Sequence, residues 1–207
     1  GTALKGDFVL DAPVDVPAQP ALLRLLQAGY HCNNARVHGG EALGDPTEVA
    51  LRVAGIKGGL ADGADRRLAE MPFDSSVKFM AVLLNHDGDR WLYVKGAPEV
   101  VLHMCSTELD GAGNCRPLDR ERALEKAGDF ASDALRALGF AGKKVGPDAQ
   151  DLRTEDLQDL CFFGLQGMID PPKASAIEAV AACRRAGIRT VMITGDHPDT
   201  AQAVARQ

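Results

Sequence analysis

The sequence predicts an α+β protein in which an antiparallel sheet flanked by helices is followed by a shorter α/β unit. The dipeptide Asp87-Gly88, between two apolar segments, is typical of a two-residue β-hairpin turn. Residues 91–101 continue with a strand-like segment, then Lys95-Gly96, then Pro98 at a position suited to the first turn of a helix. From residue 161, apolar segments alternate with a helical pattern, which indicates parallel strands joined by a right-handed crossover.

The composition is that of a water-soluble globular chain. Its 207 residues, 45% of them hydrophobic, are enough for one large or two small domains with a real core. The formal net charge of -6 argues against a general nucleic-acid partner, because such proteins are usually basic. The longest apolar segments, Phe79–Leu84 and Cys161–Met168, fall well short of the roughly 20 residues of a membrane span, so we expect no membrane insertion of this segment.

The cysteines and histidines do not predict a metal site. The five cysteines are widely spaced and form no Cys-x-x-Cys pair, which is typical of reduced thiols in a cytosolic protein. His31, Cys32 and His38 lie close together in the sequence, but their spacing matches no zinc pattern. We therefore interpret them as ordinary side chains near the end of a helix.

The first helices are predicted by proline and capping signals. Pro20 begins a helix with a leucine stripe that runs towards residues 33–34. In the segment Gly44-Asp45-Pro46-Thr47-Glu48, Asp45 is placed as an N-cap and Pro46 as the first helical residue. Glu48 falls three positions after the cap, where its carboxylate can reach back to the cap N–H as in a capping box. On these residues alone, we favour that structural role over contact with a ligand.

The register of the central hairpin follows from its turn. After a polar segment, Phe73 is placed just before a strand and is followed by a polar turn. The strand is predicted to include Lys78 and to run to about Asn85, and counting outwards from the hairpin turn places Met80 opposite Lys95. Lys78 lies two positions before Met80 on the same strand, so it shares a face with Met80 and lies about 7–8 Å from Lys95, as diagonal neighbours do. A register slip of one residue would separate the two faces.

Two lysines so close repel each other unless a negative group lies beside them. One interpretation is a phosphate-bearing ligand at the strand end formed by Lys95-Gly96; the other is an ordinary turn in which Asp74 or Glu99 neutralises the lysines. Phe73 lies at the same end of the hairpin, and by itself would usually be a core residue.

The following segments alternate again between helix and turn. A short helix is predicted over 98–105, a loop or hairpin over 107–117, and a helix from Asp119 to about Gly139, where a strand begins. Arg136 then sits at a helix end. Residues 142–159 are interpreted as a linker with a short helix.

The C-terminal unit is predicted to be strand 161–169, helix 173–186, strand 188–194 and a final helix from about residue 198. In such sheets, ligands bind beyond the carboxyl ends of the strands. Asp170 and Thr194-Gly195-Asp196 lie at those positions. We therefore predict two domains, 1–160 and 161–207.

With these residues placed, the sequence resembles the cytoplasmic part of a P-type cation-transporting ATPase, in particular the bacterial type II, calcium-pump-like group. Six short motifs carry the resemblance and occur in the family's order: Gly44-Asp45-Pro46-Thr47-Glu48, Pro72-Phe73-Asp74 with Lys78-Phe79-Met80, Val94-Lys95-Gly96-Ala97-Pro98-Glu99, Leu135-Arg136-Ala137-Leu138, Met168-Ile169-Asp170-Pro171-Pro172 and Met192-Ile193-Thr194-Gly195-Asp196-His197. Any one of them is weak evidence, and the six together are specific.

The resemblance implies an ATP site in a nucleotide-binding domain, followed by part of a haloacid-dehalogenase-like phosphorylation domain. Its nucleotide-binding positions match Glu48, Phe73, Lys78, Lys95, Gly96 and Arg136, with Phe73 as the residue that stacks on adenine. Its hinge aspartate matches Asp170, and its phosphate-facing motif matches Thr194, Gly195 and Asp196.

The resemblance also implies an intact pump in which ATP with Mg²⁺ forms an aspartyl-phosphate that drives cation transport, calcium being a guess at family level. The partners are then the remaining phosphorylation, actuator and transmembrane domains, and the location is the cytoplasmic side of the cell membrane. These 207 residues contain neither the family's Asp-Lys-Thr-Gly-Thr motif nor its Gly-Asp-Gly-x-Asn-Asp motif. We therefore expect nucleotide binding without turnover, and assign no catalytic residue.

One departure from the family pattern concerns the pocket itself. The family often carries charged residues where this chain has Ser75, Ser76 and Val77, which puts some phosphate contacts in doubt. Two alternatives stay open: a self-contained haloacid-dehalogenase-type phosphohydrolase, and a non-catalytic interaction domain that keeps the fold.

Overall fold

The computed structural model describes residues 8–9, 14–39, 41–63, 65–86, 88–133, 135–169, 174–193, 201–202 and 205. The helices are α1 (Pro20–His31), α2 (Pro46–Lys57), α3 (Pro98–His103), α4 (Arg120–Ser132) and α5 (Ala174–Arg185), with short 3₁₀ turns at Val16–Ala18 and Thr154–Asp156. The strands are β1 (Arg36–His38), β2 (Glu41–Leu43), β3 (Arg66–Asp74), β4 (Phe79–His86), β5 (Asp89–Gly96), β6 (Cys105–Leu109), β7 (Cys115–Pro117), β8 (Arg136–Val145) and β9 (Leu160–Met168).

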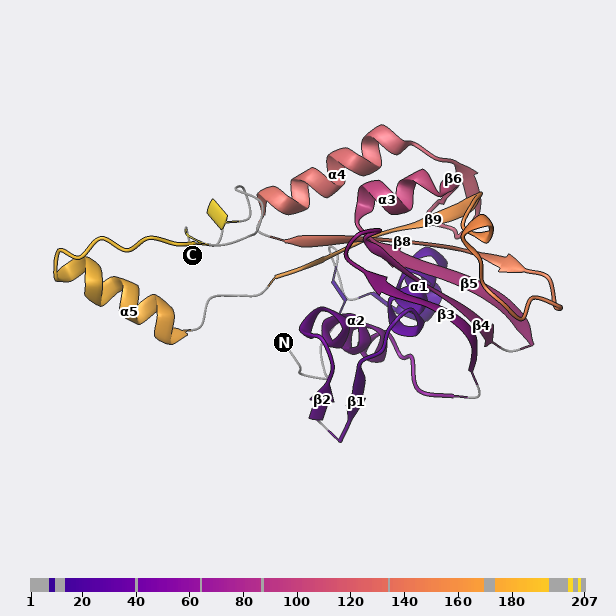
Figure 1. The fold of residues 1–207 in the computed structure, drawn as a ribbon, viewed down its shortest axis with the longest axis horizontal. Coiled ribbons are helices and arrows are strands. Elements are labelled where there is room, and N and C mark those ends of the chain that lie inside the picture. The colour runs from indigo at the N-terminus through magenta and orange to yellow at the C-terminus, as the bar shows by residue number, and fades with distance from the viewer. Residues whose placement is uncertain are drawn as a thin grey trace.

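A seven-stranded sheet in the order β3-β4-β5-β8-β9-β6-β7 forms the centre of the molecule (Figure 1). Neighbouring strands are antiparallel except for β6 and β9, which run parallel. Strands β1 and β2 form a separate two-stranded hairpin before α2. The fold is therefore a mixed sheet, mostly antiparallel, with helices against it.

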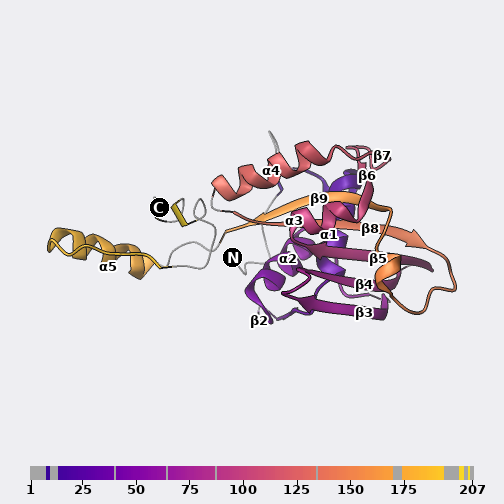
Figure 2. The same ribbon diagram turned by 45° about the horizontal axis from the view of Figure 1, so that its top comes forward.

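Helices cover both faces of this sheet because the central strands alternate apolar residues to either side. Met80, Val82 and Leu84 pack with residues of α1 and α2 in one buried cluster. Phe79 and Ala81 point to the opposite face, where residues of α3 and α4 complete a second cluster. Figure 2 shows α3 and α4 together along that side of the sheet. Two cores, one on each face, hold the central strands in a fixed register.

Several predicted elements are confirmed. Helices α1 and α2 begin at the two prolines that predicted them, and β5 leads directly into α3. The predicted hairpin register is also confirmed, with Met80 opposite Lys95 and Leu84 opposite Trp91. Asp87, one of the two predicted turn residues, lies outside the described residues.

The prediction that the strand already includes Lys78 is wrong, because β4 begins at Phe79. Residues 75–78 form a turn that separates β3 from β4, and the carboxylate of Asp74 accepts hydrogen bonds from the N–H of Ser76 at 2.7 Å and from its hydroxyl at 2.6 Å. Such a side chain offers the backbone an alternative to the sheet ladder. Lys78 therefore lies in this turn, with a positive φ of 59°, and the predicted pairing of Lys78 and Lys95 on one strand face does not form.

The boundary between α4 and β8 also differs from the prediction. The helix ends at Ser132, and β8 begins at Arg136 rather than near Gly139. Leu138 keeps helical spacing with the apolar residues of α4, but residues 136–139 pair with residues 165–168 of β9. Sheet pairing thus overrides the helical periodicity, and it carries β8 on to Val145 inside the predicted linker.

Strand β9 belongs to the main sheet and not to a separate C-terminal unit. It pairs with β8 on one side and β6 on the other, so the predicted domain boundary at 160/161 cuts through the first unit. The helix predicted at 173–186 is present as α5, followed by Gly187 at a positive φ of 73°. Residues 188–193 form no strand, which corrects the prediction for 188–194. Figure 1 shows α5 apart from the sheet.

Candidate functional site

A cavity of about 440 Å³ opens at the end of the sheet where β5 ends and β8 begins. It is bounded by the N-terminus of α2, the end of β3, and residues of β4, β5 and β8. Its lining consists of Asn34, Asp45, Thr47, Glu48, Pro72, Phe73, Met80, Lys95, Gly96, Arg136 and Leu138. Five of the six positions expected to bind nucleotide are among them: Glu48, Phe73, Lys95, Gly96 and Arg136.

One part of the lining is apolar. It consists of Pro72 and Phe73 from β3, Met80 from β4 and Leu138 from β8. Phe73 leaves 59% of its surface exposed, although a phenylalanine of a folded protein usually buries most of its ring. An exposed ring beside a cavity provides a flat surface on which an aromatic ligand can stack.

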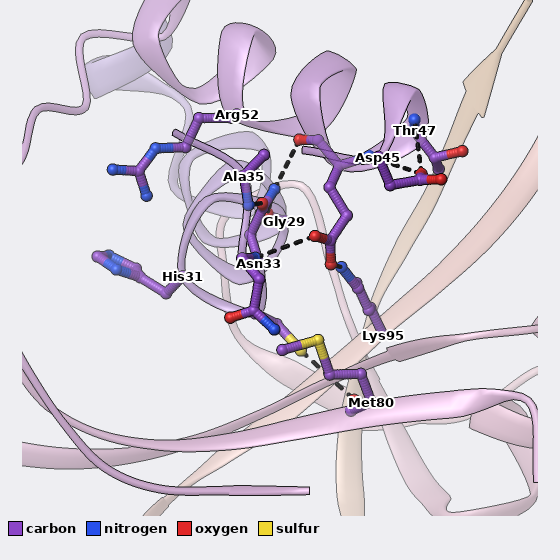
Figure 3. Close-up of polar contacts among 12 residues, drawn as sticks. Gly29, His31, Asn33, Ala35, Asp45, Thr47, Arg52, Met80 and Lys95 are labelled. Atoms are coloured by element: carbon purple, nitrogen blue, oxygen red, sulfur yellow. Dashed lines mark hydrogen bonds and ion pairs between the residues drawn. The ribbon is translucent and has the colours of Figure 1, made fainter. Parts of the chain in front are cut away.

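The other part of the lining is charged, and its centre is an ion pair. Lys95 Nζ lies 2.5 Å from Glu48 Oε1, and only 5% of Lys95 is exposed. The second carboxylate oxygen, Glu48 Oε2, accepts a hydrogen bond from the backbone N–H of Asn34 at 3.1 Å. In Figure 3, Lys95 extends from the sheet towards the first turn of α2. A buried lysine is tolerated here because a carboxylate compensates its charge.

The predicted capping box is only half formed. The Asp45 carboxylate accepts hydrogen bonds from the N–H groups of Thr47 at 2.9 Å and Glu48 at 3.4 Å, so the N-cap prediction is confirmed. The carboxylate of Glu48 contacts Lys95 and the backbone N–H of Asn34 instead. The favoured capping role for Glu48 is therefore wrong. A capping signal in the sequence cannot reveal a lysine brought close by the sheet.

Arg136 supplies the positive charge of the cavity that is free to meet an anion. It is exposed at the first residue of β8, and within the described residues it has no ion-pair partner. Lys95, in contrast, is already paired. An anionic group that enters the cavity is therefore attracted first to Arg136.

Gly96 has a structural reason to be glycine. A Cβ atom there would lie 2.5 Å from the carbonyl oxygen of Lys78 and 2.8 Å from Cβ of Phe79. The same carbonyl accepts a hydrogen bond from the N–H of Ala97 at 3.0 Å. A side chain at position 96 is therefore excluded by the chain's own turn at Lys78 and Phe79.

Lys78 is not part of the cavity lining. Its ammonium lies 3.6 Å from Glu99 Oε1, and 59% of its side chain is exposed. Neutralisation by Glu99 was one of the two alternatives raised for this lysine, and the structure has that contact. Asp170, Thr194, Gly195 and Asp196 lie outside the described residues.

Several lining residues were missed in the sequence. Leu138 lies two positions after Arg136, so the alternation of a strand would have found it if the strand had been placed correctly. Thr47 stands inside the motif that identified Glu48. Met80 follows from the predicted hairpin register, which places it opposite Lys95. Asn34 carries no local signal, because only the packing of α1 against the sheet brings it to the cavity.

This arrangement can bind a flat aromatic group joined to an anion. The apolar residues lie beside one exposed ring, and the cationic groups lie at the adjoining strand ends. The described part of the cavity offers no free carboxylate for a metal ion, since Asp45 caps α2 and Glu48 is paired with Lys95.

The chain is similar to a known family of proteins. A family profile described as "P-type ATPase, cytoplasmic domain N" matches residues 21–175. A cation-transporting ATPase of Synechocystis sp. is 42% identical over 198 residues, which cover 91% of this chain and 22% of that protein. Calcium-transporting ATPase 1 of Lactococcus lactis is 40% identical over 189 residues, which cover 88% and 22%. A probable cation-transporting ATPase F of Mycobacterium bovis is 40% identical over 223 residues, which cover 100% and 24%.

The chain thus spans less than a quarter of the length of these curated relatives. In the part of the chain that the structure describes, no helix has the length and apolar character of a membrane span.

Proposed function

Because this chain belongs to the P-type cation-transporting ATPases, as their cytoplasmic N domain, we propose that the cavity beside Phe73 binds ATP. The observation that carries the proposal is the meeting of an exposed aromatic ring with Lys95 and Arg136 around one cavity of about 440 Å³. The volume lies within the range of about 300–1,000 Å³ typical of small-molecule sites.

In the proposed complex, adenine stacks on Phe73 and contacts Leu138, and the phosphates extend towards Arg136 and Lys95. Stacking suits the adenine ring, which carries no charge, and the guanidinium of Arg136 suits phosphate oxygens, which it can bind with two parallel hydrogen bonds. Lys78 contributes from the rim after exchanging Glu99 for a phosphate. Its exposure and its surface ion pair, worth little in water, make that exchange inexpensive.

In the whole protein, we propose that this domain delivers ATP to an aspartate outside these 207 residues, and that the resulting phosphoenzyme drives cation transport across a membrane. The Mg²⁺ that accompanies ATP would be held mainly outside this chain, because the cavity's carboxylates are already engaged. The partners are the phosphorylation, actuator and transmembrane domains of the same polypeptide, and the domain lies on the cytoplasmic side. Calcium is the proposed ion by analogy with the names of several relatives.

The residues that follow β9 are proposed to enter the phosphorylation domain. Asp170 would act as the hinge, and Thr194, Gly195 and Asp196 would face the phosphate. Without the phosphate-accepting aspartate, the 207-residue chain is proposed to bind ATP without hydrolysing it. Steady ATP hydrolysis by the purified chain would contradict this part of the proposal.

Nucleotide binding can be measured by following backbone amide shifts during titration with a non-hydrolysable ATP analogue. We expect the largest shifts near Lys95-Gly96 and Arg136. Trp91 is a poor reporter, because it lies four positions before Lys95 along β5, which corresponds to roughly 13 Å.

Two substitutions test whether Phe73 and Arg136 contribute to nucleotide binding. Phe73→Ala should weaken binding by about 1–3 kcal/mol, the range for loss of stacking on a base. Arg136→Ala should weaken it roughly tenfold through loss of a charged hydrogen bond. Arg66→Ala, a matched change of an exposed arginine on β3, should leave binding unchanged. Equal affinity in all three variants would mean that the nucleotide binds elsewhere.

A further inference from the structure

We propose that His31, Asp65 and His86 form a binding site for a divalent transition-metal ion of the Zn²⁺ class, separate from the nucleotide cavity. The three residues come from different segments: His31 from the last turn of α1, Asp65 from the residue before β3, and His86 from the end of β4. Their ligand atoms all lie within 4.8 Å of one another.

Asp65 lies between the two imidazoles. Its Oδ1 is 2.6 Å from His86 Nδ1, and its Oδ2 is 3.6 Å from His31 Nε2. The two imidazole rings are 5.7 Å apart between centroids. Zinc bonds of about 2.0–2.2 Å to nitrogen and oxygen would place tetrahedral ligands roughly 3.3–3.5 Å apart. Small side-chain rotations are therefore enough to bring the three ligands around one ion.

The donor set selects the class of metal. Two imidazole nitrogens and one carboxylate are ligands that Zn²⁺, Co²⁺ and Ni²⁺ accept, whereas Ca²⁺ and Mg²⁺ prefer oxygen ligands alone. His31 is 8% exposed, and an imidazole binds a metal ion in its neutral form. Three protein ligands leave a fourth position for water.

The surrounding charges leave room for a cation. Arg52 and Arg67 both face His31, but each is paired: Arg52 with Asp62, and Arg67 with Glu70 at 2.6 Å. Asp65 therefore contributes a negative charge that these two arginines do not neutralise. A small cavity of about 150 Å³, lined by His31 and Asp65 and also by the paired Arg52 and Arg67, gives space for the water.

The proposed metal site is distinct from the nucleotide cavity. The two cavities share no lining residue. Figure 3 shows the side chain of His31 directed away from Lys95. The spacing of His31, Cys32 and His38 gave no zinc pattern, and Cys32 indeed turns inward, where its Sγ lies 3.4 Å from the carbonyl oxygen of Met80. The proposed site instead joins residues 34 and 21 positions apart, which no short motif can reveal.

The test uses the complete 207-residue chain after treatment with a chelator. Titration with Zn²⁺ in a calorimeter should give one equivalent of binding, and Co²⁺ should give the visible absorption of a tetrahedral site. His86→Ala and Asp65→Asn should each weaken Zn²⁺ binding by about tenfold or more, since even outer-shell changes cost 10–100-fold. The matched control is His38→Ala, which removes an exposed histidine on β1.

A second measurement separates metal binding from a hydrogen-bonded His–Asp–His cluster that binds none. Zn²⁺ should raise the unfolding temperature of the unaltered chain and of His38→Ala, but not that of His86→Ala. If Asp65→Asn fails to fold, His86→Gln serves in its place. The proposal is overturned if no stoichiometric binding occurs, or if His86→Ala binds Zn²⁺ as tightly as the control.

Discussion

The contact between Lys95 and Glu48 serves the fold and the cavity at once. Lys95 is almost fully buried, and its charge is compensated by the Glu48 carboxylate, which also accepts a hydrogen bond from the backbone N–H of Asn34. The pair thereby ties β5, the start of α2 and the segment after α1 together. A phosphate that enters the cavity meets a lysine already fixed in position.

Loss of one member of this pair should cost more than loss of both. Glu48→Gln leaves a buried ammonium without its counter-charge, and we expect the free energy of unfolding to fall by about 3–5 kcal/mol. The double variant Glu48→Gln/Lys95→Met should lose less than the sum of the two single changes. Urea unfolding of the four proteins measures the difference, and strictly additive losses would show that the two charges do not interact.

The sequence predicted the roles of some residues correctly and of others wrongly. Asp45 was placed correctly as an N-cap because a cap depends on the local chain. The favoured capping role of Glu48 was wrong, because its partner Lys95 comes from another element. Lys78 was wrongly placed on a strand face beside Lys95, although its contact with Glu99 was one of the alternatives considered. The local sequence restricts the conformation of a charged residue, but it does not determine which residue forms its ion pair.

Helix α2 positions three residues of the cavity, so its first turn is the element on which the site depends. Asp45 accepts from two N–H groups that would otherwise have no partner at the helix end. Thr47 and Glu48 follow in the same turn. Fraying of this turn would move Glu48 away from Lys95.

We expect Asp45→Ala to lower the free energy of unfolding by about 1 kcal/mol, the typical value for loss of an N-cap. Asp45→Asn should restore most of it, since the amide oxygen also accepts hydrogen bonds. Thermal unfolding monitored by circular dichroism measures both variants against Asp148→Ala, a change in an exposed loop. If Asp45→Ala behaves like this control, the cap contributes nothing to stability.

The elements that were predicted well are those whose ends are marked by residues that break or begin regular structure. Strand β5 and helix α3 are separated by a glycine and a proline, and the structure follows both. Strand β3 was missed because its sequence is charged at Arg66, Arg67 and Glu70, which is typical of an edge strand rather than of a buried one. The start of β8 was missed because its pairing partner lies far away in the sequence.

At the scale of the whole molecule, β9 decides where the folded unit ends. It lies between β8 and β6, and its residues Phe162 and Phe163 belong to the two opposite cores. The sequence pattern of β9 is that of any buried strand, so it could not tell which sheet the strand joins. The family match, which runs to residue 175, includes this strand.

Two truncated chains should behave in opposite ways. A chain that ends at Ile169 keeps β9 and should retain the unfolding temperature of the full chain, since α5 packs on none of the sheet's buried clusters. A chain that ends at Asp159 loses an internal strand and should not fold. The dispersion of the backbone amide signals in magnetic resonance spectra shows whether each truncated chain is folded. A folded chain ending at Asp159 would support the boundary predicted at 160/161.

The two outer strands of the sheet carry a consequence for association between molecules. Strand β3 is interrupted by two shifts of register and carries Pro72, and β7 has only three residues and ends at Pro117. Short or irregular outer strands with proline and charge offer a poor template for pairing with another copy. The domain should therefore stay monomeric at the high concentrations that magnetic resonance requires, which dynamic light scattering can verify before any titration begins.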